Sequence, residues 1–91
     1  MNKPLFSEIW KLIISYEGVE FSTVTNLPFT YQINGKTLRP SRTQYNISMS
    51  DFAKAYDLVP IDNTGKITKL VRGPSYIYAI LHDKRISKNQ W

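Results

Sequence analysis

A chain of 91 residues, 42% hydrophobic and 13% aromatic, can form one small core but is too short for two domains, and this apolar content excludes a wholly disordered chain. The absence of cysteine excludes disulfides, thiolate nucleophiles and cysteine-based zinc sites. The formal net charge of +5 favours anionic partners such as nucleic acid, although it says nothing about the fold.

Segments that direct a chain to or across a membrane are not recognisable here. No apolar run approaches the roughly 18 residues that a membrane span needs. The first residues also lack the basic region, apolar core and small-residue cleavage site of a signal peptide. We therefore expect a cytoplasmic protein without a membrane partner.

Residues 4–16 have the pattern of an amphipathic helix. Pro4 suits a first helical turn, where its missing N–H is no loss, and Gly18 follows as a stop signal. Apolar side chains recur at helical spacings on one face: Leu5, Ile9, Leu12, Ile13 and Tyr16. The sequence predicts a core-facing helix.

A β-hairpin is predicted over residues 29–39, around Asn34-Gly35. A type I′ turn needs positive φ at both central residues, and asparagine and glycine tolerate it. This turn would place Ile33 opposite Lys36. The apolar face would carry Phe29, Tyr31, Ile33 and Leu38, and the outer face Thr30, Gln32, Thr37 and Arg39. A half-buried sheet with a polar, positively charged outer face follows.

Further strands are predicted beside this hairpin. Residues 19–25 are rich in β-branched and aromatic types, and Asn26-Leu27-Pro28 ends that run. The expected unit is a three-stranded antiparallel meander with residues 29–33 in the middle. Residues 67–71 could add a fourth short strand, while residues 40–46 are polar and indicate a loop.

Two later segments carry helix signals. Ser48 can cap a helix with Asp51 three residues on, and Pro60 would end it. Residues 76–81 form an apolar run that is compatible with a buried strand or a helix. A helix is favoured because Pro74 fits its first turn. Cationic side chains after the run, His82, Lys84 and Arg85, would complement the helix dipole. Residues 87–90 are expected to fray, with Trp91 either docked or in solvent.

Few residues of the sequence have a spacing that is typical of catalysis or of metal or phosphate binding. His82 is the only histidine, and it suits a helix C-terminus better than a catalytic triad. Asp57, Asp62 and Asp83 do not have metal-binding spacing, and the four glycines are too scattered for a phosphate-binding loop. We therefore expect no enzyme, no metal and no cofactor.

The basic residues are the feature with the strongest functional implication. Residues 21–48 hold three cations and no acid, and residues 63–91 hold six cations and one acid. Three groups supply the candidate nucleic-acid-binding residues: Lys36, Arg39 and Arg42; Lys66, Lys69 and Arg72; Lys84 and Arg85. Two converging groups would form a phosphate-binding surface. Exposed tyrosines could stack on bases, with Tyr31, Tyr45 and Tyr78 as candidates.

The sequence thus predicts one α+β domain over residues 1–91, with a three- or four-stranded antiparallel sheet packed against two or three helices. The predicted core comprises Phe6, Ile9, Ile13, Phe29, Tyr31, Ile33, Phe52, Ile77 and Ile80. The expected function is non-catalytic binding of DNA or RNA. The alternative is a protein-interaction or accessory subunit, either with a foreign partner or as a homodimer, motivated by large apolar residues such as Trp10 and Trp91.

Overall fold

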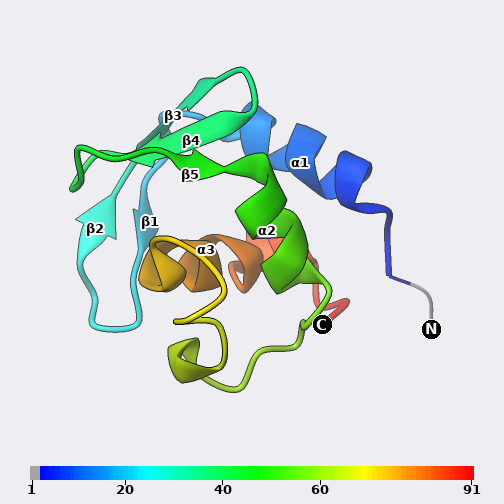
Figure 1. Ribbon diagram of the computed structural model, residues 1–91. Helices are drawn as coiled ribbons and strands as arrows, with labels where there is room; N and C mark the ends of the chain where they lie inside the picture. Colours follow the sequence, from blue (N-terminus) through cyan, green and yellow to red (C-terminus); the bar gives the residue numbers. More distant parts are fainter. Residues whose placement is uncertain (1–2) are drawn as a thin grey trace.

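The computed structural model describes residues 3–91 and confirms the α+β class (Figure 1). In chain order the elements are α1 (Phe6–Ser15), β1 (Phe21–Ser22), β2 (Pro28–Phe29), β3 (Tyr31–Asn34), β4 (Thr37–Pro40), β5 (Ile47–Ser48), α2 (Met49–Tyr56), the 3-10 helix η1 (Thr64–Lys66), α3 (Pro74–Leu81) and α4 (Lys84–Ser87). The strands form one two-stranded sheet, β1-β2, and one three-stranded sheet, β3-β4-β5, both antiparallel.

The division into two sheets differs from the single predicted meander. Phe29 pairs with Phe21 of β1, whereas Tyr31 pairs with Pro40 of β4. Thr30 between them exchanges hydrogen bonds with Ser41: its N–H donates to Ser41 Oγ (3.0 Å), and its carbonyl accepts from Ser41 N (2.8 Å). The predicted middle strand therefore changes partner at Thr30, and β5 supplies the third strand of the larger sheet. Residues 67–71, expected as a possible fourth strand, form turns.

The hairpin is confirmed, but its turn lies one residue later than predicted, so each residue of β3 pairs with a partner two positions further along the chain. Ile33 lies opposite Leu38, and the two-residue loop is Gly35-Lys36. Gly35 has φ +60°, whereas Asn34 and Lys36 have no positive φ, as expected for a type II′ turn with glycine first. This register pairs Ile33 with an apolar partner and leaves Lys36 exposed, which explains why it replaces the predicted Ile33–Lys36 pairing. The inner and outer faces stay as predicted.

The N-terminal helix is confirmed with a slightly different buried face. Ile9, Trp10 and Ile13 are buried, whereas Leu5 lies just before the helix and is 72% exposed. The Trp10 ring packs against Phe52 of α2, at a centroid distance of 5.6 Å. The buried face of α1 therefore includes Trp10.

Helix α2 begins where its capping signal predicts. Ser48 Oγ accepts a hydrogen bond from Asp51 N (3.1 Å), and Phe52, Ala55 and Tyr56 are buried. The same Ser48 ends β5, so strand and helix follow each other without a loop.

The apolar run at residues 76–81 forms a helix. Pro74 lies in the first turn of α3, and Ile77, Ile80 and Leu81 are buried against the other elements. The expected cationic side chains are not in the last turn of α3, which holds no basic residue. His82 Nε2 accepts a hydrogen bond from Ile61 N (3.2 Å), and Lys84 and Arg85 belong to the separate helix α4.

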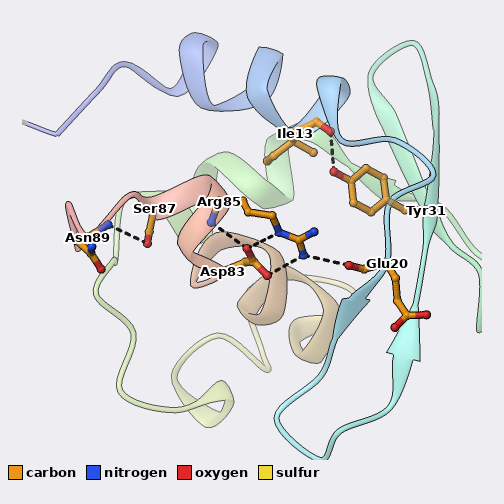
Figure 2. Close-up of polar contacts among 7 residues, drawn as sticks. All are labelled: Ile13, Glu20, Tyr31, Asp83, Arg85, Ser87 and Asn89. Atoms are coloured by element: carbon orange, nitrogen blue, oxygen red, sulfur yellow. Dashed lines mark hydrogen bonds and ion pairs between the residues drawn. The ribbon is translucent and has the colours of Figure 1, made fainter.

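The C-terminal tail makes contacts with the rest of the chain at Ser87 and Trp91. Ser87 is buried, and its Oγ accepts a hydrogen bond from Asn89 N (3.3 Å; Figure 2). The Trp91 indole N–H donates to Leu81 O (2.8 Å), and its ring meets Tyr56 edge-on at a centroid distance of 5.2 Å. Of the two alternatives for Trp91, docking is the one observed.

The core lies between the sheets and the helices. Seven of the nine predicted core residues are buried, while Phe6 and Ile33 are half-buried and pack against the core. Tyr31 and Phe52 are among the largest fully buried side chains. None of the helices formed by residues 3–91 combines the length and apolar character needed to cross a bilayer.

Candidate nucleic-acid interface

A polar groove lies on the outer face of β3 and β4. Gln32 and Arg39 are cross-strand neighbours there, and both side chains are exposed. The groove has a volume of about 540 Å³, and the buried residues Tyr31 and Pro40 contribute to its lining. We call it the sheet groove; its polar lining consists of Thr30, Gln32, Arg39, Ser41, Thr43 and Gln44. Two amides, three hydroxyls and one guanidinium therefore face a single hollow.

The surroundings of this groove are positively charged. Residues 21–50 contain no aspartate or glutamate but contain Lys36, Arg39 and Arg42. All three are exposed, and the ion pairs formed within residues 3–91 involve other cations. Two carboxylates lie at the edges of the same sheet. Glu17 Oε2 accepts a hydrogen bond from Ile33 N (2.8 Å), at the edge of β3 away from β4, and Asp51 follows β5, where its N–H donates to Ser48 Oγ (3.1 Å). Lys36, Arg39 and Arg42 form no ion pair with either of them.

Arg72, from the second basic group, lies beside Tyr45 and the start of α2. Its guanidinium carbon lies 5.3 Å from the centre of the Tyr45 ring. Its backbone N–H donates to Asp51 Oδ2 (2.9 Å), which fixes the segment before α3 against the start of α2. The neighbouring Gly73 packs against the buried side chain of Ile47, so Arg72 lies by the inner side of β5 and does not join the outer face of the sheet. We call the two hairpin cations that flank Arg39, Lys36 and Arg42, the basic rim.

The other members of the second group lie elsewhere. Lys66 belongs to η1 and sits 3.6 Å from Asp62. In Figure 1, η1 is at the bottom of the molecule, whereas the β3–β4 turn is at the top. Lys69 is exposed in the turn that follows η1. Lys66 and Lys69 therefore do not join the basic rim.

Arg85, from the third group, is part of the framework. Its Nε and Nη2 donate to the two Asp83 carboxylate oxygens, each at 2.9 Å, and Nη2 also donates to Glu20 O at 2.9 Å (Figure 2). The guanidinium lies 4.1 Å from the Phe21 ring centre. These hydrogen bonds from Arg85 lower the pKa of Asp83. Arg85 thus ties α4 to β1, and neighbouring Lys84 remains exposed outside the groove lining.

Two of the three candidate stacking tyrosines are committed to internal contacts. Tyr31 is buried and its hydroxyl donates to Ile13 O (2.6 Å; Figure 2); burial also raises its pKa. Tyr78 is half-buried and stacks on His82 at 4.5 Å. Tyr45 is half-buried beneath Arg72, and burial raises its pKa as well. Tyr31 therefore cannot stack on a base.

Other chemistry finds little support among the described residues. His82 is half-buried, and burial lowers its pKa, so that its Nε2 is free to accept from Ile61 N. Asp62 and Asp83 pair with Lys66 and Arg85. Residues 3–91 contain no cluster of three or more histidine, aspartate or glutamate side chains placed to hold a metal ion.

The sequence prediction missed the hydroxyl and amide lining of the groove. The hairpin pattern already placed Gln32 and Arg39 on the outer face. Ser41, Thr43 and Gln44 belong to a segment whose polarity indicated only a loop. The signal that could have found them is the combination of that polarity with the absence of acids on either side.

Comparisons with protein-family models, with curated proteins and with solved structures found no match to this chain. A function for the chain therefore has to be inferred from its own residues.

Proposed function

We propose that the protein binds nucleic acid, without catalysis, through the sheet groove and its basic rim. The observation that carries this proposal is the exposed Arg39 in a polar groove, within a thirty-residue stretch, residues 21–50, that contains cations but no carboxylate. Clustered cations of this kind attract polyanions such as nucleic acid.

The arginines, the lysine and the hydroxyl side chains can each make a different contact with a nucleic acid at such a surface. Arg39 and Arg42 can each donate two parallel hydrogen bonds to phosphate oxygens, whereas Lys36 acts as a point charge at the hairpin turn. The hydroxyls of Thr30, Ser41 and Thr43 belong to the types that contact sugar and phosphate. Contacts of this kind position a nucleic acid without reading its sequence.

The test is to replace Arg39 and Arg42 with alanine and to titrate labelled DNA and RNA at two salt concentrations. We assume three phosphate contacts, from Lys36, Arg39 and Arg42. Affinity for duplex DNA should then fall about 40-fold between about 50 and 200 mM salt, because the slope of log affinity against log salt concentration is about −0.9 per contact. Loss of two contacts should reduce the size of that slope by about 1.8 and weaken binding similarly across sequences.

A matched control removes the same charge from another part of the surface. Lys11 in α1 and Lys84 in α4 are exposed, lie outside the groove lining and take no part in the ion pairs formed within residues 3–91. The double variant Lys11→Ala, Lys84→Ala also lowers the net charge by two, and it should leave the salt slope nearly unchanged. Equal effects of the two double variants would show that overall charge, and not this surface, governs binding. Absence of binding at low salt would reject the proposal.

The large apolar residues that suggested the alternative, a protein-interaction subunit, are mostly buried in the structure. Trp10 is buried, Trp91 docks on Tyr56, and the apolar run of α3 is largely buried. Some support remains in exposed apolar side chains, among them Val24 (64%) and Leu27 (44%) in the β1–β2 connection. Light scattering at increasing protein concentration would test self-association directly.

A further inference from the structure

We infer that the sheet groove takes an unpaired nucleotide of a single-stranded nucleic acid and that Gln32 and Gln44 contact its base. This inference rests on the proposed function and specifies the class of nucleic acid. It is carried by the shape of the groove and by the kind of side chains that line it.

The shape favours one strand over a duplex. At about 540 Å³, the groove falls within the range of roughly 300 to 1,000 Å³ typical of small-ligand sites. Its lining brings Gln32 and Arg39 of the β3–β4 pair together with Ser41, Thr43 and Gln44 of the loop after β4 around one hollow. Reading a duplex requires an element that enters the major groove, about 12 Å wide. A hollow cannot do this, whereas it can receive a strand whose bases are unpaired.

The lining provides the groups that an unpaired nucleotide needs. Amide side chains both donate and accept, so Gln32 and Gln44 can bond the polar edge of a base. Arg39 lies directly across from Gln32 in the register and supplies the cation for a phosphate. An amide and a guanidinium side by side thus match the two chemically different parts of one nucleotide.

Base recognition would come from hydrogen bonding, because stacking is not available from the groove floor. Tyr31 contributes to the lining, but it is buried and its hydroxyl is bonded to Ile13 O. Stacking tolerates every base, whereas hydrogen bonds distinguish them. A single-stranded ligand bound in this groove should therefore show a preference among bases.

The experiment measures affinities for single-stranded oligo(dA), oligo(dC) and oligo(dT), their RNA counterparts, and a duplex of the same length. A length of about eight nucleotides suits a small single-strand-binding domain. The wild-type protein should bind its best single strand about tenfold or more tightly than the duplex. The variant Gln32→Ala, Gln44→Ala should lose about tenfold in that affinity, as expected for two lost hydrogen bonds. The differences among bases should shrink, while the salt slope stays unchanged.

The control is Gln90→Ala, which removes the third glutamine of the chain, an exposed residue outside the sheet groove, and should change nothing. Circular dichroism confirms that each variant is folded. If no nucleic acid binds, the proposed function fails and this inference with it. If the wild-type protein binds duplex as tightly as single strand, or if the glutamine pair can be removed without effect, only this inference is overturned. Comparison of the DNA and RNA series then identifies the source of the strand.

Discussion

The same residue type plays two unrelated roles in this molecule, depending on its neighbours. Arg85 forms a two-point ion pair with Asp83 and also reaches Glu20 O, so it stabilises the framework. Arg39 has no carboxylate partner within residues 3–91 and is exposed on the sheet. The sequence identified both as cations, but it could not separate them, because only the tertiary structure brings Glu20 and Phe21 to Arg85.

His82 gives the stability of the protein a predicted pH dependence. Burial lowers its pKa below the ordinary value of 6.5, and the neutral ring accepts a hydrogen bond from Ile61 N. The unfolded chain therefore takes up a proton at a higher pH than the folded one. The contribution of neutral His82 is complete above about pH 6.5, and it declines as the pH falls from there toward the lower folded pKa.

The measurement is urea unfolding followed by circular dichroism at several pH values from about 5 to 8, the range in which an ordinary histidine titrates. His82 is the only histidine, so His82→Gln should flatten the pH dependence in this window. The glutamine oxygen can still accept from Ile61 N and limits the structural damage. A wild-type protein that becomes more stable on acidification from pH 6.5 would contradict the assigned sign.

At the scale of the elements, local signals predicted helices well and strand partners poorly. Ser48 with Asp51, and Pro74 before an apolar run, placed the starts of α2 and α3 correctly, because capping and first-turn preferences act within one turn of helix. The change of partner at Thr30 has no comparable local signal. It depends on Ser41, eleven positions away, satisfying both backbone groups of Thr30.

The two glycines Gly35 and Gly73 provide a matched test of element geometry. Both have positive φ, +60° and +63°, so alanine at either position should cost about 1 to 2 kcal/mol in backbone strain. A Cβ at Gly35 would meet nothing within 4 Å. At Gly73 it would lie 2.6 Å from Ile47 Cδ1 and 3.2 Å from the Tyr45 hydroxyl. Gly73→Ala should therefore destabilise by about 1 to 3 kcal/mol more than Gly35→Ala, the usual range for overpacking.

Urea midpoints of both variants, compared at unchanged slope, measure this difference. Similar losses of stability would mean that the Ile47 side chain moves aside without penalty. Because Gly73 adjoins Arg72, Gly73→Ala should also disturb the contact of Arg72 with Tyr45, whereas Gly35→Ala tests the hairpin turn alone.

At the scale of the whole molecule, the chain ends are fastened by contacts that the sequence did not reveal. Tyr56, in the middle of the chain, donates its hydroxyl to Pro4 O and receives the edge of the Trp91 ring. Polarity alone suggested a frayed C-terminal tail, because nothing in residues 87–90 signals that Trp91 finds both a ring and the Leu81 carbonyl. The α+β class followed from the order of the elements, but this closure did not.

Trp91→Ala should destabilise the fold by about 2 kcal/mol, through one lost hydrogen bond and one lost aromatic contact. Trp91→Phe keeps a ring beside Tyr56 and loses only the indole N–H, so its loss should be about 1 kcal/mol. Urea unfolding of both variants tests this order. Equal stability of wild type and Trp91→Ala would show that the docked side chain contributes nothing. Neither change should affect nucleic-acid binding, since Trp91 is outside the sheet groove.

Part of the candidate site, the placement of Gln32 and Arg39, could be predicted from the sequence. Alternation along the hairpin strands assigned Gln32 and Arg39 to the outer face, and the structure confirms this assignment. Moving the turn by one residue shifts the pairing by two residues, so the partners change but each side chain stays on its predicted face. The approach of Arg72 to Tyr45 depends on the packing of the segment before α3 against the start of α2. No spacing in the sequence encodes it.

The pairing of strands that are consecutive in the chain has a consequence for how the protein folds. Within residues 3–91, β1 pairs with β2, β3 with β4, and β4 with β5, so each pairing closes only a short loop. The entropy lost in such closures is small, and topologies rich in local contacts fold quickly. The contact between α1 and α4 instead joins opposite ends of the chain and closes its largest loop. We therefore expect the two sheets to assemble early and the docking of α4 against α1 to follow, because that contact closes the longest loop.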